Sequence, residues 1–251
     1  MTNSSTTKQN IVSICLWLLI WQAVAMIINE EILFVSPLSV LFKFPELIKS
    51  FIFWQSISFS ILRILAGFFI STILSSIFAY IAYKSAAIEA FFRPIITVIK
   101  STPVASFIIL ALIFIGKDIV PMFICMLMVT PIVYSNVLNG LKNVDKDLKE
   151  MSKLYDTKQI KHLYFPSLLP YITAAIDSGL GLCWKAGIAA EVICRTIPSI
   201  GNQIWETKFY IETTEMFAYT TVVILLSVLF DFLIKKATRA VLKKYNVEVV
   251  K

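Results

Sequence analysis

The stretch IVPMFICMLMVTPIVYSNVLNGL, residues 119–141, contains no charged residue. A helix rises about 1.5 Å per residue, so roughly 20 apolar residues are needed to cross the roughly 30 Å of hydrocarbon in a bilayer. This stretch is therefore long enough to form a transmembrane helix. Residues 11–28 and 64–83 are also free of charge and predict two more spans. The mean hydropathy of the 251-residue chain is +0.80, which excludes a water-soluble domain.

Three other apolar segments carry charges within or at their ends: residues 94–116, 170–194 and 214–234. Together with the first three they predict an all-α, polytopic membrane protein with six transmembrane helices. An ionisable side chain inside a span costs at least about 2.5 kcal/mol on insertion scales, and such side chains usually line a solute pathway or form pairs. The charges in these segments are therefore candidates for function. Asp231 and Lys235 are four residues apart, which predicts an ion pair at a helix end rather than a site.

The distribution of lysine and arginine predicts the orientation. If the N-terminus is cytoplasmic, fifteen of these cations lie on the cytoplasmic side and five on the outer side. This bias predicts that both termini are cytoplasmic. Ala23-Val24-Ala25 resembles a signal-peptide cleavage site, but the apolar run continues through Ile28, which favours a retained anchor. We expect an N-terminal anchor with an outer amphipathic segment (1–55), a transmembrane domain (56–236) and a basic cytoplasmic tail (237–251).

The composition also excludes several classes of site. The chain has one histidine, His162, and no CxxC pair, so a zinc or haem site is not expected. We expect the four cysteines to be buried as small apolar residues. No glycine lies in a P-loop frame, so this chain is not expected to bind ATP, and no cofactor is predicted. The net charge of +7 is interpreted as a topology signal, and nothing indicates nucleic acid. The cysteines are Cys15, Cys125, Cys183 and Cys194.

The segment between the fourth and fifth predicted spans, residues 142–165, has the pattern of a short amphipathic helix. Leu148, Met151 and Tyr155 recur at helical spacing, with Leu154 alongside, while charged residues occupy the other face. One interpretation is a helix lying on lipid headgroups. The other is a helix that docks into a protein groove. The segment mixes four acidic residues with six lysines, whereas membrane-surface helices are usually dominated by cations, which favours the groove.

Glu150-Met151-Ser152, followed by Leu169-Pro170 before a span, resembles the EAA loop of ATP-binding-cassette (ABC) importer permeases. Four other segments resemble the nitrate/sulfonate/taurine-type permeases, and the resemblance extends over residues 32–240. These segments are SPLSVLFKFPELIKS (36–50), SILRILAGF (60–68), KSTPVASFIILALIFIG (100–116) and GLGLCWKAGIAAEVI (179–193).

This resemblance implies a type I ABC importer permease in the cell membrane, working with a second copy or a paralogue and with an extracytoplasmic solute-binding protein. ATP hydrolysis would take place on separate ATPase chains, which would dock on the coupling loop. Asp156 stands where the family usually has glycine, and Asp tolerates a left-handed turn better than most residues. The family suggests a small anionic or heteroaromatic solute, in the class of sulfonates, nitrate, taurine or pyrimidine precursors. The expected coupling residues are Leu148, Glu150, Met151, Ser152, Tyr155 and Asp156.

Within the fifth predicted span, Ala175, Gly179, Cys183, Gly187 and Glu191 recur at steps of four and form a ridge of mostly small residues. This ridge is interpreted either as helix packing within the chain or as a face toward the partner permease or the solute path.

Five residues are candidates for the solute pathway. Lys185 lies past the midplane of its span beside Trp184, an arrangement that suits an anionic or aromatic solute. Glu191 lies six residues further on. Lys100 is expected near the cytoplasmic start of its helix, and Arg63 near the outer end of its own.

Two other classes of function remain as alternatives. An ion-coupled secondary transporter subunit would use Asp177 and Glu191 to carry protons or sodium. A membrane enzyme would need nucleophile, base or metal ligands at one depth, which one histidine and scattered carboxylates do not supply.

Overall fold

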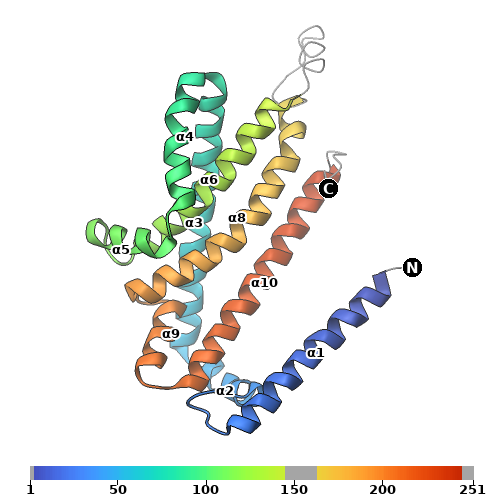
Figure 1. Cartoon of the computed structure of the whole chain (residues 1–251), viewed down its shortest axis with the longest axis vertical. Coiled ribbons are helices and arrows are strands. Elements are labelled where there is room, and N and C mark those ends of the chain that lie inside the picture. The colour runs from blue at the N-terminus through green and yellow to red at the C-terminus, as the bar shows by residue number, and fades with distance from the viewer. Residues whose placement is uncertain (1–2, 145–162, 245–251) are drawn as a thin grey trace.

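The computed structural model describes residues 3–144 and 163–244 (Figure 1). None of these residues lies in a strand, which confirms the all-α prediction. The helices within them are α1 (Asn3–Ile28), α2 (Pro37–Lys49), α3 (Phe51–Lys84), α4 (Ala86–Ser101), α5 (Val104–Phe114), α6 (Val120–Lys142), α8 (Phe165–Cys194), α9 (Ile200–Phe209) and α10 (Thr213–Lys244).

The bundle has two distinct ends (Figure 1). At the loop end, α3 and α6 finish and α4 and α8 begin, around residues 84–86 and 142–165. At the opposite end, here called the α9 end, lie α2, α9 and the start of α10. Helices α3, α6 and α8 form the centre, α10 runs alongside α8, and α1 extends away from the bundle beyond α10. The indole of Trp21 ties α1 to the segment before α2 by donating to the Val35 carbonyl at 2.9 Å.

The central helices meet at Cys125 of α6. A Cβ added to Gly67 of α3 would come within 2.7 Å of the Cys125 Cβ, and a Cβ added to Gly187 of α8 would come within 2.7 Å of its Sγ. Only glycine permits approaches this close. The predicted ridge on α8 is buried against α3 and α6, so the helix-packing interpretation is confirmed and the interpretation as a partner-facing ridge is wrong.

Three of the described helices, α3, α6 and α10, are individually long and apolar enough to cross a membrane. Helices α4 and α5 meet this criterion only together, and they are bent by 108° at the break between them. The span predicted over residues 94–116 as one helix is therefore divided between two helices, and the prediction of a single helix there is wrong. Pro94 lies within α4, whereas Pro103 lacks an N–H and holds Thr102 in an extended conformation (φ −87°, ψ 133°), which ends the helix.

The six predicted spans correspond to α1, α3, the α4–α5 pair, α6, α8 and α10. Helix α3 begins at Phe51, well before the predicted start of the second span at residue 64. Helix α8 runs for 30 residues and contains all three charges that the sequence places in the fifth span. The chain is thus a multi-pass membrane protein.

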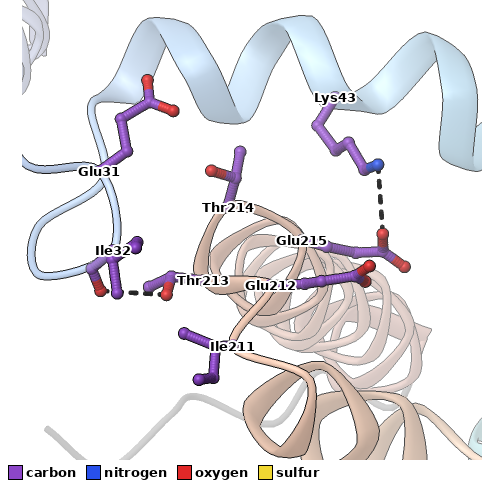
Figure 2. Close-up of a pocket in the computed structure, with 8 residues that line it drawn as sticks. All are labelled: Glu31, Ile32, Lys43, Ile211, Glu212, Thr213, Thr214 and Glu215. Carbon is purple, nitrogen blue, oxygen red and sulfur yellow. Dashed lines mark hydrogen bonds and ion pairs between the residues drawn. The ribbon is translucent and has the colours of Figure 1, made fainter.

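Helix α2 is fastened to the start of α10 at the α9 end (Figure 2). Lys43 Nζ lies 2.8 Å from Glu46 and 3.3 Å from Glu215. Hydrogen bonds to these two carboxylates raise the pKa of Lys43, against the opposing effect of partial burial. Thr213 adds a hydrogen bond to the Ile32 carbonyl at 3.0 Å. These contacts border a small polar cavity of about 280 Å³.

Three of the four cysteines are buried as predicted: Cys125, Cys183 and Cys194. The prediction is wrong for Cys15, which is exposed. Cys15 lies on α1, where most large apolar side chains are exposed because the helix stands apart from the bundle.

Candidate functional site

The predicted coupling residues lie outside the described residues, but both ends of their loop are described. Lys142, the last residue of α6, binds both carboxylate oxygens of Glu89 on α4 at 2.6 and 2.7 Å. Asn143 donates to the Tyr171 hydroxyl on α8 at 3.2 Å. A Cβ at Gly140 would lie within 2.9 Å of the Tyr171 ring. The loop therefore starts from a base in which α4, α6 and α8 are held together.

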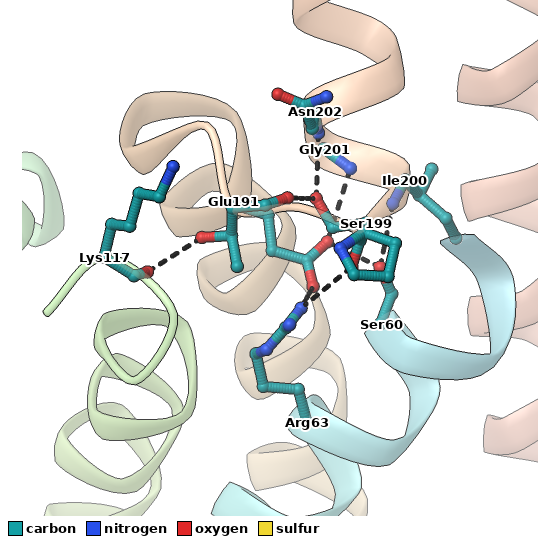
Figure 3. A network of polar contacts seen from close by, with 10 residues as sticks. Ser60, Arg63, Lys117, Glu191, Ser199, Ile200, Gly201 and Asn202 are labelled. Atoms are coloured by element: carbon teal, nitrogen blue, oxygen red, sulfur yellow. Dashed lines mark hydrogen bonds and ion pairs between the residues drawn. The ribbon is translucent and has the colours of Figure 1, made fainter. Parts of the chain in front are cut away.

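A buried carboxylate lies near the other end of α8 (Figure 3). The Glu191 side chain is 0% exposed and forms an ion pair with Arg63 of α3 at 3.0 Å. The Ser60 hydroxyl donates to its second oxygen at 2.7 Å. Burying a carboxylate is costly unless a cation and further hydrogen bonds compensate it, and this site supplies both.

The same carboxylate organises the start of α9. The Gly201 N–H donates to Glu191 at 3.3 Å, and the Ile200 N–H donates to the Ser60 hydroxyl at 2.9 Å. Both amides belong to the first turn of α9, where unpaired N–H groups and the helix dipole favour a negative charge. A Cβ at Gly201 would clash with the Cβ of Glu191 and approach the Val192 nitrogen to 2.6 Å. The carboxylate thus joins α3, α8 and α9 at one point.

The connection between α8 and α9 is also fixed. Thr196 donates to the Lys117 carbonyl at 2.9 Å, which ties the connection to the segment between α5 and α6. Ser199 caps α9 by accepting a hydrogen bond from the Asn202 N–H at 2.9 Å. Arg195, in a left-handed conformation with φ 53°, places its guanidinium 3.6 Å from the centre of the Trp205 ring.

Arg63 and Glu191, two of the residues predicted for the solute pathway, therefore form one structural pair. Sequence reasoning did not pair them, because they lie on different helices and 128 positions apart. The signal was present: Arg63 was expected near the outer end of its span, Glu191 stands close to the end of the segment 170–194, and opposite charges at one depth can neutralise each other. Engagement with Arg63 also removes Glu191 as a free carrier of protons or sodium.

Trp184 and Lys185 are neighbours in the sequence but face different sides of α8. The Trp184 side chain is 2% exposed, donates to the Val223 carbonyl of α10 at 3.1 Å and lies 5.4 Å from the Phe230 ring. Lys185 is exposed, and no carboxylate among the described residues forms an ion pair with it. An unpaired ammonium in a membrane helix is suited to attracting an anion. The small residues Ala174, Ser178, Gly181 and Ala189 are exposed as well.

Lys100 lies in the last turn of α4, not near the start of its helix as predicted. The reason is that α4 begins at Ala86, so that Lys100 lies about 21 Å along the helix. Its Nζ donates to the Ser135 hydroxyl of α6 at 3.0 Å. The other predicted pair, Asp231 and Lys235, is confirmed at 2.7 Å.

Residues 71–243 match the family model described as "Binding-protein-dependent transport system inner membrane component". The chain belongs to this family. It is the permease subunit of an ABC importer, as the resemblance of the coupling loop predicted, and the alternative of a secondary transporter subunit is wrong.

Among the relatives of this permease is a Bacillus subtilis protein named as the permease SsuC of aliphatic sulfonates transport, 25% identical over 90% of this chain and 84% of that protein. The bicarbonate transport system permease protein CmpB of Synechococcus elongatus is 25% identical over 62% of this chain and 57% of its own length. The nitrate import permease protein NrtB of Synechocystis is 26% identical over 59% and 54%, respectively.

The fold of this permease is similar to a chain of the methionine ABC transporter MetNI in an inward-facing conformation. The TM-score is 0.54 at 15% identity, and the match covers 76% of this chain and 93% of the other. This likeness confirms the type I importer architecture expected from the sequence.

Proposed function

We propose that this permease carries a small inorganic or organic anion into the cell. The observation that carries the proposal is the exposed Lys185 on α8, which forms no ion pair with any carboxylate in residues 3–144 and 163–244. It lies fifteen residues beyond Pro170, about 22 Å along the helix and deep in the span. The names of the relatives add support, because sulfonates, bicarbonate and nitrate are all anions.

The exposed residues of α8 around Lys185 include the small Ser178, Gly181 and Ala189, which leave room beside the ammonium. Leu182 and Asp177 are exposed on α8 as well. The proposed path runs along this exposed face of α8 and is completed by a second copy of this chain or a paralogue. Lys185 attracts the anion at the depth where lipid would otherwise exclude it. Trp184 has a different role: it holds α10 against α8 through its indole N–H.

The loop end faces the cytoplasm in this proposal, and both termini lie on that side. Separate ATPase subunits dock on the loop around Glu150 and hydrolyse the ATP, and a separate solute-binding protein docks at the α9 end. The base formed by Glu89, Lys142 and Tyr171 supports this arrangement, because a loop that transmits the motion of the ATPase subunits to the helices needs fixed ends. The family description, which names binding-protein-dependent transport, supports the partner at the outer face.

The test is co-purification of the chain from its native membrane, with and without Glu150→Arg, followed by uptake assays in cells with isotope-labelled nitrate, bicarbonate and ethanesulfonate. We expect an ATPase to co-purify with the wild type and to be lost from, or uncoupled in, the variant. We expect one of the three anions to accumulate in an ATP-dependent manner. A chain that purifies alone would contradict the partner assignment, and an intact complex that moves none of the three anions would contradict the substrate class.

A further inference from the structure

A second group of cationic and hydroxyl side chains surrounds a cavity between α4 and α6, on the side of the break nearer the loop end. The volume of the cavity is about 210 Å³. A water molecule occupies about 30 Å³ in the liquid, so the cavity has room for an anion of a few heavy atoms. It is lined by Glu89, Arg93, Ile96, Thr97, Lys100, Tyr134, Ser135 and Leu138.

The charges that line this cavity leave a positive excess. Lys100 reaches Ser135 and forms no ion pair with any carboxylate in the described part of the chain. The acidic residue in the lining is Glu89, and both of its oxygens bind Lys142, which lies outside the cavity. Arg93 approaches Glu89 only to 3.7 Å and is 76% exposed. An anion would therefore meet Lys100, which no described carboxylate pairs, and Arg93, whose partner Glu89 is bound more closely by Lys142.

The hydroxyl groups have unused hydrogen-bonding capacity. Tyr134 is 5% exposed, and its hydroxyl is buried without a hydrogen-bond partner among the described residues. A buried hydroxyl left unpaired is costly, so a ligand that accepts a hydrogen bond from it recovers this cost. Ser135 accepts from Lys100 at 3.0 Å, which leaves its own proton available.

We propose that the cavity between α4 and α6 binds a small oxyanion through Lys100, Arg93 and the Tyr134 hydroxyl. Ammonium, guanidinium and phenol groups all donate, and an oxyanion is the ligand that accepts from all three. The occupant is either the transported anion before its release or the phosphate of a lipid headgroup. The inference rests on the proposed anion transport for the first of these identities only.

The position of the cavity distinguishes it from the path along α8. The long Lys100 side chain points back along α4, as helical side chains do, so its ammonium lies nearer the loop end than its Cα. Glu89 joins the lining of the cavity directly to the base of the coupling loop. An anion bound here therefore lies beside the part of the chain that the ATPase subunits are proposed to move.

The test is protection of a cysteine from alkylation. Thr97→Cys places a thiol on the lining, and Cys15→Ser removes the exposed native thiol. The full-length chain, with the subunits that co-purify, is placed in phosphatidylcholine nanodiscs. The rate of N-ethylmaleimide labelling is then measured at increasing concentrations of nitrate, bicarbonate or methanesulfonate. Chloride at the same ionic strength is the reference. We expect saturable protection by at least one oxyanion.

Two variants test the named donors. Lys100→Gln removes one charge-assisted hydrogen bond, so the half-protecting concentration should rise at least about tenfold. Tyr134→Phe removes only the hydroxyl, and a rise of about threefold to tenfold is expected. Lys84→Gln is the matched control, because Lys84 is a cation at the same end of the bundle but lies over the Tyr80 ring and not in the cavity. If Tyr134→Phe does not assemble, the Lys100→Gln variant still provides the test, because the Lys100 side chain is exposed and its replacement should not disturb folding.

The outcomes separate the two sources of the oxyanion. Protection by a soluble oxyanion in phosphatidylcholine alone identifies a solute site. Protection that increases with phosphatidylglycerol content and resists soluble oxyanions identifies a lipid phosphate. The proposal would be overturned if neither an oxyanion nor an anionic lipid slowed the labelling. It would also be overturned if the half-protecting concentration were the same in Lys100→Gln and Tyr134→Phe as in the parent protein. The uptake assay tests the transported substrate separately, so failure of one assay does not decide the other.

Discussion

Arg63 of α3 and Glu191 of α8 are 128 positions apart in the sequence, and their side chains lie 3.0 Å apart beside the first turn of α9. Glu191 is fully buried and also accepts hydrogen bonds from Ser60 and the Gly201 amide. A change to either charge is therefore a change to the junction of three helices.

The first prediction concerns the charge balance of this junction. Arg63→Met leaves the buried carboxylate without its cation and should cost about 3–5 kcal/mol of stability. The double variant Arg63→Met/Glu191→Gln removes both charges and should recover a large part of that loss. Thermal unfolding in detergent, followed by intrinsic fluorescence, measures both effects. Equal stability of the single and double variants would contradict the pairing, and Arg239→Met is the control for loss of an exposed arginine on α10.

The second prediction compares two glycines. Gly201→Ala places a Cβ against the Cβ of Glu191, so α9 must shift and stability should fall by about 1–3 kcal/mol. Gly181→Ala is the matched change, because a Cβ at Gly181 has no neighbour within 4 Å and alanine favours a helix by up to about 1 kcal/mol. The melting temperatures should therefore move in opposite directions. A stable Gly201→Ala variant would mean that α9 does not rest on Glu191.

The third prediction concerns transport. Lys185→Met should lower anion uptake at least about tenfold, because a hydrogen bond to a charged group contributes about 1.5–3 kcal/mol. The amount of assembled complex should stay unchanged, since the side chain is exposed. Lys185→Arg, which keeps the charge, should retain most uptake. Lys208→Met, an exposed change on α9, serves as control, and normal uptake by Lys185→Met would refute the assignment.

The fourth prediction concerns Glu89 and Lys142. Reversing either charge alone should repel the start of α4 from the end of α6 and reduce the coupling of ATP hydrolysis to uptake. The swapped variant Glu89→Lys/Lys142→Glu should restore the coupling at least partly. The ratio of solute moved to ATP hydrolysed is the measurement. The stability changes should stay below about 1 kcal/mol because the pair is partly exposed, and failure of the swap to restore the ratio would show that the contact does not transmit motion.

Local patterns predicted much of this fold. The uncharged runs identified α3 and α6, and the spacing of Asp231 and Lys235 identified their ion pair, because these features depend on neighbours within a few turns of one helix. The coupling-loop pattern around Glu150 led to the correct family. Non-local features were not predicted. The pairing of Arg63 with Glu191 depends on how α3 and α8 pack, which no local pattern contains.

The two prolines of the third predicted span illustrate the same limit. Pro94 and Pro103 both lack an N–H, yet α4 continues through the first and ends before the second. The predicted span started at Pro94, whereas α4 begins at Ala86, and this difference displaced the predicted depth of Lys100. The Tyr134 hydroxyl likewise lacks a hydrogen-bond partner among the described residues, and this becomes apparent only when its surroundings are known.

The contacts of Gly67 and Gly187 with Cys125 have a consequence for motion. Sliding α3 past α6 would disturb the close approach of Gly67 to the Met122 carbonyl and the Cys125 Cβ, and sliding α8 would disturb the packing of Gly187 against Cys125 and Ile64. A transporter that alternates between two shapes must then move α3, α6 and α8 as one rigid body. We expect bending between states where the described chain lacks these contacts, and the 108° break at Thr102 and Pro103 is one such place.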